Sequence, residues 1–391
     1  MVEWSPNRAK QNGKHRARAS GALNQVLRVG DGPPPSDDLH RDLVLIILAG
    51  HTSNFEPTIT MTTSSPHIVL TGTTGGLGSA VLRHILAQDS IPPSKLIISL
   101  YNPNKAPSSL TDLTSLGVDI RHGDYTSPDS LEGAFDGAGI LFLVSYPSIA
   151  HKQRVDAHKN AVDAAKRAGV SHVIYTSLAF GGNLEDSSVA AVMRAHLDTE
   201  AYLKASGLTY TIVREGIYSE SYPLYLGFFD PSSGQEEVYI PDDGNGGIAW
   251  ASRDELGEAT ARLIARAYNN DLLSSPSILN TTLLLSGPEA ISLSSLAAII
   301  STLLQRPNPI RVNYVPTDTY ATSSTALERL GPNFARLWAT TYEALKRGEC
   351  AVVSPTLEML LGRRPREMKS VLEEILNDVG AAQGTIDQYA K

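Results

Sequence analysis

The glycines at positions 72, 75 and 78 are the residues whose type and spacing point most directly to chemistry. They stand in Gly72-Thr-Thr-Gly-Gly-Leu-Gly78, between an apolar run at 67–71 and a stretch at 79–87 that predicts a helix. Glycine lets the backbone turn sharply beside a pyrophosphate, and a helix start offers free N–H groups and a positive dipole. The motif therefore predicts a dinucleotide-phosphate site, the alternative being a purely structural tight turn. The expected contacts are Gly72, Thr74, Gly75, Leu77 and Gly78.

The end of the second apolar run indicates which dinucleotide binds. NAD specificity usually needs an Asp or Glu there for the ribose hydroxyls, but residues 101–105 read Tyr-Asn-Pro-Asn-Lys. Asn102 and Lys105 could instead face a 2′-phosphate, so the sequence favours NADP(H) over NAD(H). The alternative is that Lys105 is only a solvated loop residue. A further cofactor contact is expected from Asp124, at the adenine edge. Contacts near the nicotinamide are expected from Ser145, Tyr146 and Thr176.

A Tyr-x-x-x-Lys pair could protonate a nascent alkoxide, because the lysine lowers the pKa of the tyrosine. The chain has two such pairs, Tyr101 with Lys105 and Tyr342 with Lys346. The first would lie beside the adenosine and the second far beyond the sheet, so both are interpreted as chance. The window after the fifth apolar run, 175–208, contains no such pair.

That window contains His196 instead. An imidazole with a pKa near 6.5 could donate a proton to a carbonyl or quinone oxygen, or hydrogen-bond it as charge builds. The alternative is that His196 only packs between a helix and the sheet. Glu200, one turn later, could orient the ring or pair with Lys204. Tyr218, the second candidate catalytic residue, is expected either to wall the pocket or to belong to the core.

Six short apolar runs supply the elements that must position these groups. They alternate with helical patterns, as at 150–168 and 196–205, which is typical of a parallel sheet covered on both faces. We therefore expect an α/β fold with a Rossmann-type, doubly wound parallel sheet and ligands at the carboxyl ends of its strands. The runs lie at 67–71, 96–100, 118–122, 140–144, 172–176 and 210–214.

The chain from Tyr218 onward is less regular. It has glycine-rich loops at 227–247 and amphipathic patterns near 291–305 and 366–376. This region, 218–376, is expected to form a small C-terminal lobe on the substrate side.

The domain as a whole is expected to span 61–391, with its dinucleotide-binding part at about 66–217. Residues 1–60 are interpreted as a largely disordered leader. The apolar run at 43–49 falls far short of the roughly 20 residues that cross a bilayer.

Composition restricts the class of protein. The 391 residues are 42% hydrophobic and 19% charged, which is ordinary for a globular enzyme, and the net charge of -8 argues against nucleic-acid binding. The single cysteine, Cys350, excludes an intrachain disulfide. His, Cys and Asp residues nowhere show metal-ligand spacing, so no metal is expected. We expect a cytoplasmic monomer or homodimer without a membrane partner.

Several motifs occur together, in a fixed order along the chain. Besides the glycine loop they are Tyr175-Thr-Ser-Leu178, His196-Leu-Asp-Thr-Glu200, Arg214-Glu-Gly-Ile-Tyr-Ser-Glu220, Ser252-Arg-Asp-Glu255, Leu285-Ser-Gly-Pro-Glu289, Ser354-Pro-Thr-Leu-Glu358 and Gly362-Arg-Arg-Pro365. Over residues 66–376 this set resembles the NmrA-like branch of atypical short-chain dehydrogenases, and within it the NADPH:quinone oxidoreductases. The resemblance implies a Rossmann fold, NADP(H) binding and two-electron reduction of quinones or related aromatic compounds. One departure is Tyr101, where family members often carry an Arg that helps to hold the 2′-phosphate.

Two functions stay open at this point. The first is an NAD(P)H-dependent oxidoreductase that passes hydride to a quinone or aromatic substrate, including polyketide intermediates of secondary metabolism. Quinones accept hydride readily, so a site without a Tyr-Lys pair suits them. The second is a non-catalytic, nucleotide-sensing regulator of the NmrA type, which the resemblance also implies.

Overall fold

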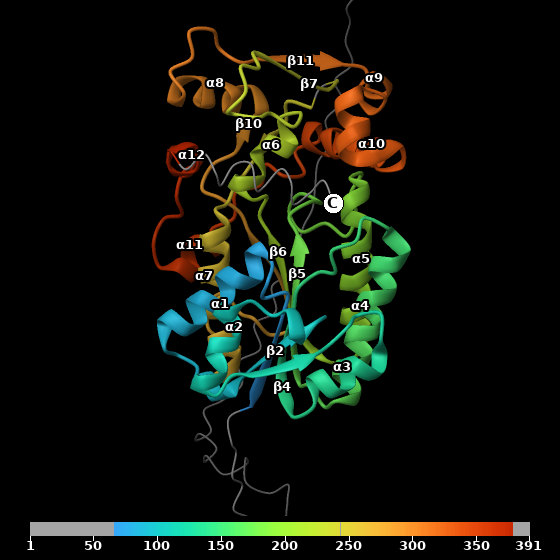
Figure 1. The fold of residues 1–391 in the computed structure, drawn as a ribbon, viewed down its shortest axis with the longest axis vertical. Helices are drawn as coiled ribbons and strands as arrows, with labels where there is room; N and C mark the ends of the chain where they lie inside the picture. The colour runs from blue at the N-terminus through green and yellow to red at the C-terminus, as the bar shows by residue number, and fades with distance from the viewer. Residues whose placement is uncertain (1–65, 243, 378–391) are drawn as a thin grey trace, which may run out of the picture. The chain divides into compact units, whose positions relative to one another are not determined.

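A parallel sheet of seven strands forms the centre of the computed structural model, which describes residues 66–242 and 244–377 (Figure 1). The leader predicted at 1–60 lies outside the described residues. The strands are β1 (His67–Thr71), β2 (Leu96–Leu100), β3 (Asp119–His122), β4 (Ala138–Leu143), β5 (His172–Leu178), β6 (Thr209–Glu215) and β9 (Thr281–Leu285). All neighbouring pairs are parallel, so the α/β prediction is confirmed.

The strand order β3-β2-β1-β4-β5-β6-β9 reverses direction at β1. Val69 of β1 is paired with Ile97 of β2 on one side and with Leu141 of β4 on the other. In doubly wound sheets the crevice outside the carboxyl ends of the strands at this reversal is where ligands bind. The loops that follow β1, β4 and β5 are therefore where a ligand is expected to bind.

Helices cover both faces of the sheet, because successive strand residues point to opposite sides. Ile68 and Leu70 of β1 pack into the core below α1, α7 and α11, whereas Val69 packs into the core below α3, α4 and α5. These helices are α1 (Gly76–Gln88), α7 (Arg253–Tyr268), α11 (Thr356–Leu361), α3 (Pro128–Phe135), α4 (His151–Arg167) and α5 (Ala191–Ala205). Short turns are η1 (Pro93–Lys95), η2 (Pro103–Lys105), α2 (Ser108–Thr111) and η3 (Asp112–Leu116).

The seventh strand is an addition to the six that the sequence predicts. β9 pairs with β6, so that Val213 lies beside Leu283, and α7 provides the crossover between the two strands. An excursion into the C-terminal lobe separates β6 from α7, and this hides the strand-helix-strand pattern in the sequence. The dinucleotide-binding part therefore does not end at residue 217, as expected from the sequence. After passing through the C-terminal lobe, the chain returns to the sheet and adds α7 and β9 to it.

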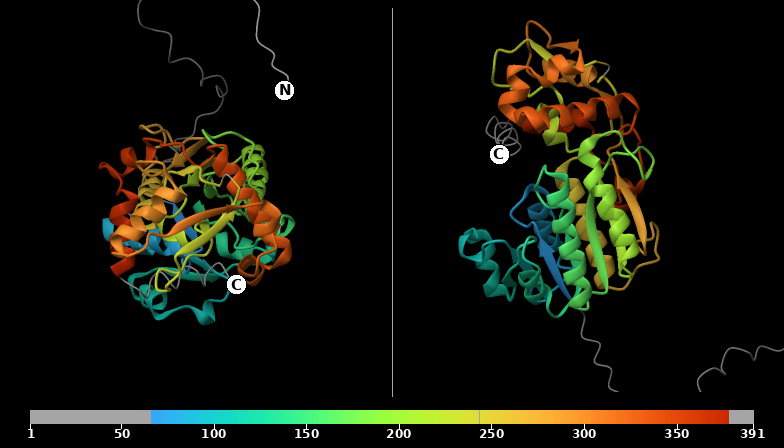
Figure 2. Two further views of the ribbon diagram at one scale, coloured as in Figure 1. Left: turned by 90° about the horizontal axis from the view of Figure 1, so that it is seen from above. Right: turned by 90° about the vertical axis from the view of Figure 1, so that its right-hand side faces the viewer.

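The C-terminal lobe has a core of its own, which includes Tyr222, Phe229, Trp250 and Trp338. It stands beyond the carboxyl ends of the central strands (Figure 2). Its elements are η4 (Ser219–Ser221), α6 (Tyr222–Tyr225), β7 (Glu237–Pro241), β8 (Gly247–Ile248), β10 (Ile291–Ser292), α8 (Leu293–Leu303), β11 (Arg311–Val315), α9 (Thr317–Ala321), α10 (Ser324–Lys346) and α12 (Met368–Asn377). Helices α8 and α12 occur where the amphipathic patterns predict them.

Helix α10 is absent from the sequence-based expectation. It contains Gly331 with φ of +71° followed by Pro332, and this pair breaks the helical pattern. Because the break divides one long helix into two short parts, the sequence on either side of it shows no clear helical periodicity. Within the described part of the chain, no helix combines the length and the apolar character needed to cross a membrane.

Candidate active site

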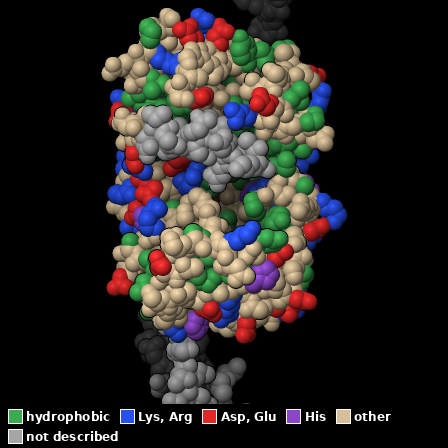
Figure 3. All heavy atoms as spheres, in the orientation of Figure 1, with side chains coloured by type: hydrophobic (Ala, Val, Ile, Leu, Met, Phe, Trp, Pro, Cys, Tyr) green, Lys and Arg blue, Asp and Glu red, His purple; other side chains and the backbone are tan. Residues whose placement is uncertain are grey.

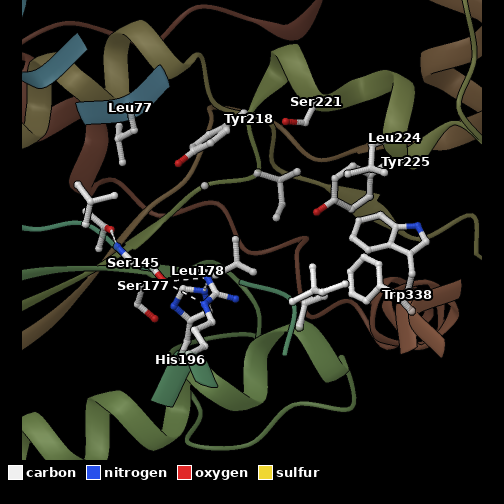
Figure 4. Close-up of a pocket in the computed structure, with 18 of the residues that line it drawn as sticks. Leu77, Ser145, Ser177, Leu178, His196, Tyr218, Ser221, Leu224, Tyr225 and Trp338 are labelled. Atoms are coloured by element: carbon white, nitrogen blue, oxygen red, sulfur yellow. Dashed lines mark hydrogen bonds between the residues drawn. The ribbon is translucent and has the colours of Figure 1, made fainter. Parts of the chain in front are cut away.

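A cavity of about 320 Å³ lies between the carboxyl ends of β4, β5 and β6 and the C-terminal lobe. Figure 4 shows polar side chains on the sheet side and aromatic ones on the lobe side. This volume and mainly apolar lining suit a small organic ligand. On the lobe side, Tyr225 lies edge-on to Trp338 with ring centroids 5.2 Å apart, and Phe334 lies 6.3 Å from the same indole. Sequence reasoning missed these aromatic residues because two of them belong to the broken helix α10.

The glycine loop follows β1 and turns directly into α1. Gly75 N donates to Gly72 O over 2.9 Å, and Gly75 caps the helix without a side-chain hydrogen bond. Gly72 has a φ of +66°, and a Cβ there would lie 2.7 Å from the Cβ of Val144. A Cβ on Gly78 would lie 2.2 Å from Gly72 O. Only glycine fits these two places, and the first N–H groups of α1 stay available to an anion. Thr74 is exposed at the loop, while Leu77 lines the cavity.

A guanidinium with unused donors faces this loop. Arg253 opens α7, and a Cβ on Gly76 would lie 2.5 Å from its Nη1. Its Nε and Nη2 are buried and have no hydrogen-bond partner among the described residues. Buried donors without acceptors cost about 1–3 kcal/mol each, so this arrangement fits an anionic pyrophosphate. The sequence carries Arg253 inside one of the family motifs, but nothing there links it to the glycine loop.

The expected adenosine side lies beyond β2 and β3. Asn102 and Lys105 are exposed, the latter at the end of η2, and β2 is the direct neighbour of β1. Asp124 Oδ1 accepts hydrogen bonds from the backbone N–H and the hydroxyl of Thr126, both over 2.8 Å. The carboxylate of Asp124 thus closes a local turn after β3.

The residues expected near the nicotinamide separate into two groups. Ser145 and Thr176 both line the cavity, and Ser145 N donates to Thr176 Oγ1 over 3.0 Å. Tyr146 is not among the lining residues. Its ring packs against Tyr125, 5.5 Å away, and its backbone N–H donates to His158 Nε2 over 2.8 Å. The structure therefore brings Ser145 and Thr176 to the cavity and directs Tyr146 away from it.

Arg154 and His196 meet at the sheet side of the cavity. Arg154 Nη2 lies 2.8 Å from His196 Nε2 and 2.8 Å from Ser145 Oγ. A guanidinium can only donate, so His196 Nε2 accepts and the imidazole carries its proton on Nδ1, 3.0 Å from Tyr175 Oη. Both ring nitrogens of His196 are thereby engaged. Arg154 Nη1 has no hydrogen-bond partner among the described residues, so the free donors at this point belong to Arg154.

The His196 imidazole is neutral at physiological pH. Burial and the nearby charge of Arg154 hold its pKa well below the usual 6.5. The expected pKa near 6.5 thus does not apply to the folded protein, because the sequence cannot reveal a cation packed against the ring. A catalytic or substrate-contacting role for His196 stays a prediction. His196 lies in the second turn of α5, which begins at Ala191, and not near the start of its helix as the sequence predicts.

Glu200 contacts neither ring nitrogen of His196. Its carboxylate forms a two-point ion pair with Arg214 of β6, with Oε1 2.9 Å from Nε and Oε2 2.8 Å from Nη2. Both residues are 1% exposed, and Ser177 donates a further hydrogen bond of 2.5 Å to Oε1. Lys204, the partner that the sequence predicts, lies more distant, with Nζ 3.9 Å from Oε2.

Tyr218 follows β6 and forms part of the cavity wall. The guanidinium carbon of Arg253 lies 5.1 Å from the centre of its ring, within range of a cation–π contact. Tyr218 thus connects the cavity with the arginine that faces the glycine loop.

The comparisons with known proteins agree with this geometry. A family profile described as NAD(P)H-binding matches residues 72–226. An NmrA-like family domain-containing oxidoreductase of Aspergillus flavus is 34% identical over 312 residues, covering 79% of this chain and 94% of that protein. Quinone oxidoreductase 2 of Escherichia coli is 34% identical over 200 residues, covering 51% of this chain and 64% of the relative.

A solved structure shows the same relationship. The NADPH-dependent quinone oxidoreductase of Escherichia coli, crystallised with NADPH, superposes with a TM-score of 0.64 at 28% identity. The match covers 79% of this chain and all of the other. The sequence motifs, the doubly wound sheet and the glycine loop therefore have one explanation: the chain belongs to the NmrA-like family of NAD(P)H-dependent oxidoreductases.

Proposed function

We propose that the protein uses NADPH to reduce a quinone or a related aromatic acceptor by two electrons in the cavity of about 320 Å³. One observation carries this proposal. The cavity sets aromatic residues of the lobe opposite a guanidinium, Arg154, which has free donors and no carboxylate partner among the described residues. Stacking surfaces suit a planar ring, and a fixed cation suits an oxygen on which negative charge develops.

The preference for NADPH rests on the residues after β2. No carboxylate stands at 101–105 to accept the ribose hydroxyls, and the exposed Asn102 and Lys105 can meet a 2′-phosphate. The similar quinone oxidoreductase of Escherichia coli is named as NADPH-dependent. Arg253 and the N-terminus of α1 would hold the pyrophosphate, since Arg253 has two buried donors without partners among the described residues.

The bound cofactor would supply a hydride, and the chain would stabilise the oxygen that becomes negative. Arg154 would donate to that oxygen through Nη1. Ser145 and the neutral His196 act as positioning residues, because their hydrogen bonds hold the other side of the guanidinium. Since His196 is neutral, the proton that completes the hydroquinone would come from water. Tyr218, Tyr225 and Trp338 would wall the acceptor.

The test is NADPH and NADH oxidation at 340 nm by the full chain, with a panel of neutral quinones as acceptors. We expect turnover that favours NADPH. Arg154→Met, which keeps volume but removes the charge, should lower kcat/KM about 100-fold, as the loss of one oxyanion donor does. Arg154→Lys should recover part of the loss. Tight NADPH binding without reduction of any quinone would overturn the proposal and favour a nucleotide sensor.

His196→Ala separates the positioning role from a direct one. We expect kcat to fall about tenfold, because the guanidinium loses one of its two holders. The kcat of the wild type should not follow a group with a pKa near 6.5, since burial and Arg154 hold the pKa of His196 far lower. A pH profile of kcat with a step near pH 6.5 that disappears in His196→Ala would contradict the assignment.

A further inference from the structure

A second cavity, of about 410 Å³, adjoins the first between α4, α5 and α10. The two cavities share lining residues, among them Arg154, which stands between them. The lining residues that matter for its chemistry are Ile149, His151, Arg154, Arg194, Phe334 and Leu337.

One wall of this second cavity carries uncompensated positive charge. Arg154 and Arg194 form no ion pair with a carboxylate among the described residues. The other basic group in the lining is already paired, since His151 Nε2 lies 2.9 Å from Asp198 Oδ2. The neighbouring Lys152, outside the lining, is also paired, with Asp156 at 2.5 Å. Of the basic side chains in the lining, only Arg154 and Arg194 thus lack a carboxylate partner among the described residues.

The rest of the lining is mainly apolar. Ile149 is 64% exposed and Leu337 is 43% exposed, which is unusual for large aliphatic side chains, and Phe334 lies with them in the lining. A cavity lined by these two arginines and by apolar side chains fits a group that is itself partly apolar and partly anionic. Arginine recognises carboxylate, sulfonate and phosphate oxygens through paired N–H donors.

We propose that the second cavity binds the anionic substituent of an aromatic acceptor whose ring is reduced in the first cavity. The substituent is a carboxylate, sulfonate or phosphate, and Arg194 with Arg154 receives it. This inference rests on the proposed function, because it names the substrate class of the same site. Arg194 acts on recognition only, since it does not line the cavity in which the ring is reduced.

The test compares two matched acceptors, 1,4-naphthoquinone and its 2-sulfonate, with NADPH. Arg194→Gln should raise KM for the sulfonate about five- to tenfold and change KM for the neutral quinone less than about twofold. Lys152→Gln is the matched control, because it also removes one positive charge near the start of α4 but from outside both cavities. It should leave both KM values unchanged. Raising the salt concentration to about 0.5 M should reduce the wild type's advantage for the sulfonate.

Equal effects of Arg194→Gln on both acceptors, or no effect on either, would overturn the inference. Calorimetric binding of the sulfonate to the protein–NADP⁺ complex, in which no hydride can pass to the acceptor, separates this failure from failure of the proposed function. If no quinone is reduced but the sulfonate binds and Arg194→Gln weakens it, the anion site stands and the proposed reaction falls. If the neutral quinone is reduced and the sulfonate binds no better to the wild type than to Arg194→Gln, the reaction stands and the anion site falls.

Discussion

Two arginines on adjacent parts of the fold, Arg214 and Arg154, are held in opposite ways. Arg214 of β6 is 1% exposed, and the two-point ion pair with Glu200 neutralises its charge. Arg154 of α4 lines both cavities, and its described partners, Ser145 and His196, are neutral. An arginine that is paired with a carboxylate, like Arg214, has its charge used within the fold. An arginine that is held only by neutral groups, like Arg154, keeps its charge available to a ligand. Under the proposed function, this difference separates a structural arginine, Arg214, from one that serves the ligand, Arg154.

Removing the neutralising partner should have the largest effect on the molecule. Glu200→Gln leaves the charge of Arg214 buried without a counter-ion and should lower the free energy of unfolding by roughly 3–5 kcal/mol. The matched control is Glu343→Gln, which breaks the surface pair with Arg347 and should cost at most about 0.5 kcal/mol. Urea denaturation at pH 7.5 measures both. A loss no greater for Glu200→Gln than for Glu343→Gln would remove the distinction drawn between the two arginines.

A third arginine extends the comparison to the cofactor. Arg253 has two buried nitrogens without partners among the described residues and faces the glycine loop, so it should behave like Arg154. Arg253→Met should weaken NADPH binding about tenfold, because it removes charged hydrogen-bond donors from the pyrophosphate. Calorimetric titration with NADPH measures the change. Arg262→Met, which removes a cation from the same helix and its pair with Glu258, provides a control that should bind NADPH normally.

If Arg253→Met binds NADPH as tightly as the wild type does, Arg253 serves the fold alone. The free energy of unfolding in the absence of cofactor distinguishes the two roles. We expect it to change by only about 1 kcal/mol, because the variant relieves two unsatisfied donors. It also removes a positive charge near the buried Glu220, but the hydrogen bond from the backbone N–H of residue 253 to that carboxylate remains.

The smallest expected effect concerns the buried histidines that stand beside the uncompensated charge. Burial and then the charge of Arg154 lower the pKa of His158 to about 3. The folded state resists protonation while the unfolded chain titrates near 6.5, so this contribution to stability is complete above pH 6.5 and decreases as the pH falls toward 3. Between pH 7.5 and 5.5 the loss should be about 1.4 kcal/mol per histidine of this kind.

Replacement of His158 by Gln should make the stability less dependent on pH over that interval. The control is His151→Gln, at a half-exposed residue of the same helix. Urea midpoints at the two pH values provide the measurement. If both variants retain the pH dependence of the wild type, buried neutral imidazoles do not account for it.

Part of this protein could be predicted because the information is local in the chain. The apolar runs, the glycine loop and its helix specify a doubly wound sheet, since strand periodicity and the glycine requirement depend on neighbouring residues only. The absence of an acid at 101–105 is equally local. By contrast, β9 was hidden by a long excursion of the chain, and α10 by Gly331 and Pro332.

The chemistry of the site depends on contacts between distant parts of the chain. The sequence by itself determined the fold class, the glycine loop and the family motifs, and it predicted that His196 lies near the carboxyl ends of the strands. Only the tertiary structure brought Arg154 against His196, 42 residues away, and Arg253 against the glycine loop. Charge and burial act through space, so the pKa of an imidazole and the freedom of a guanidinium depend on neighbours that no local pattern specifies.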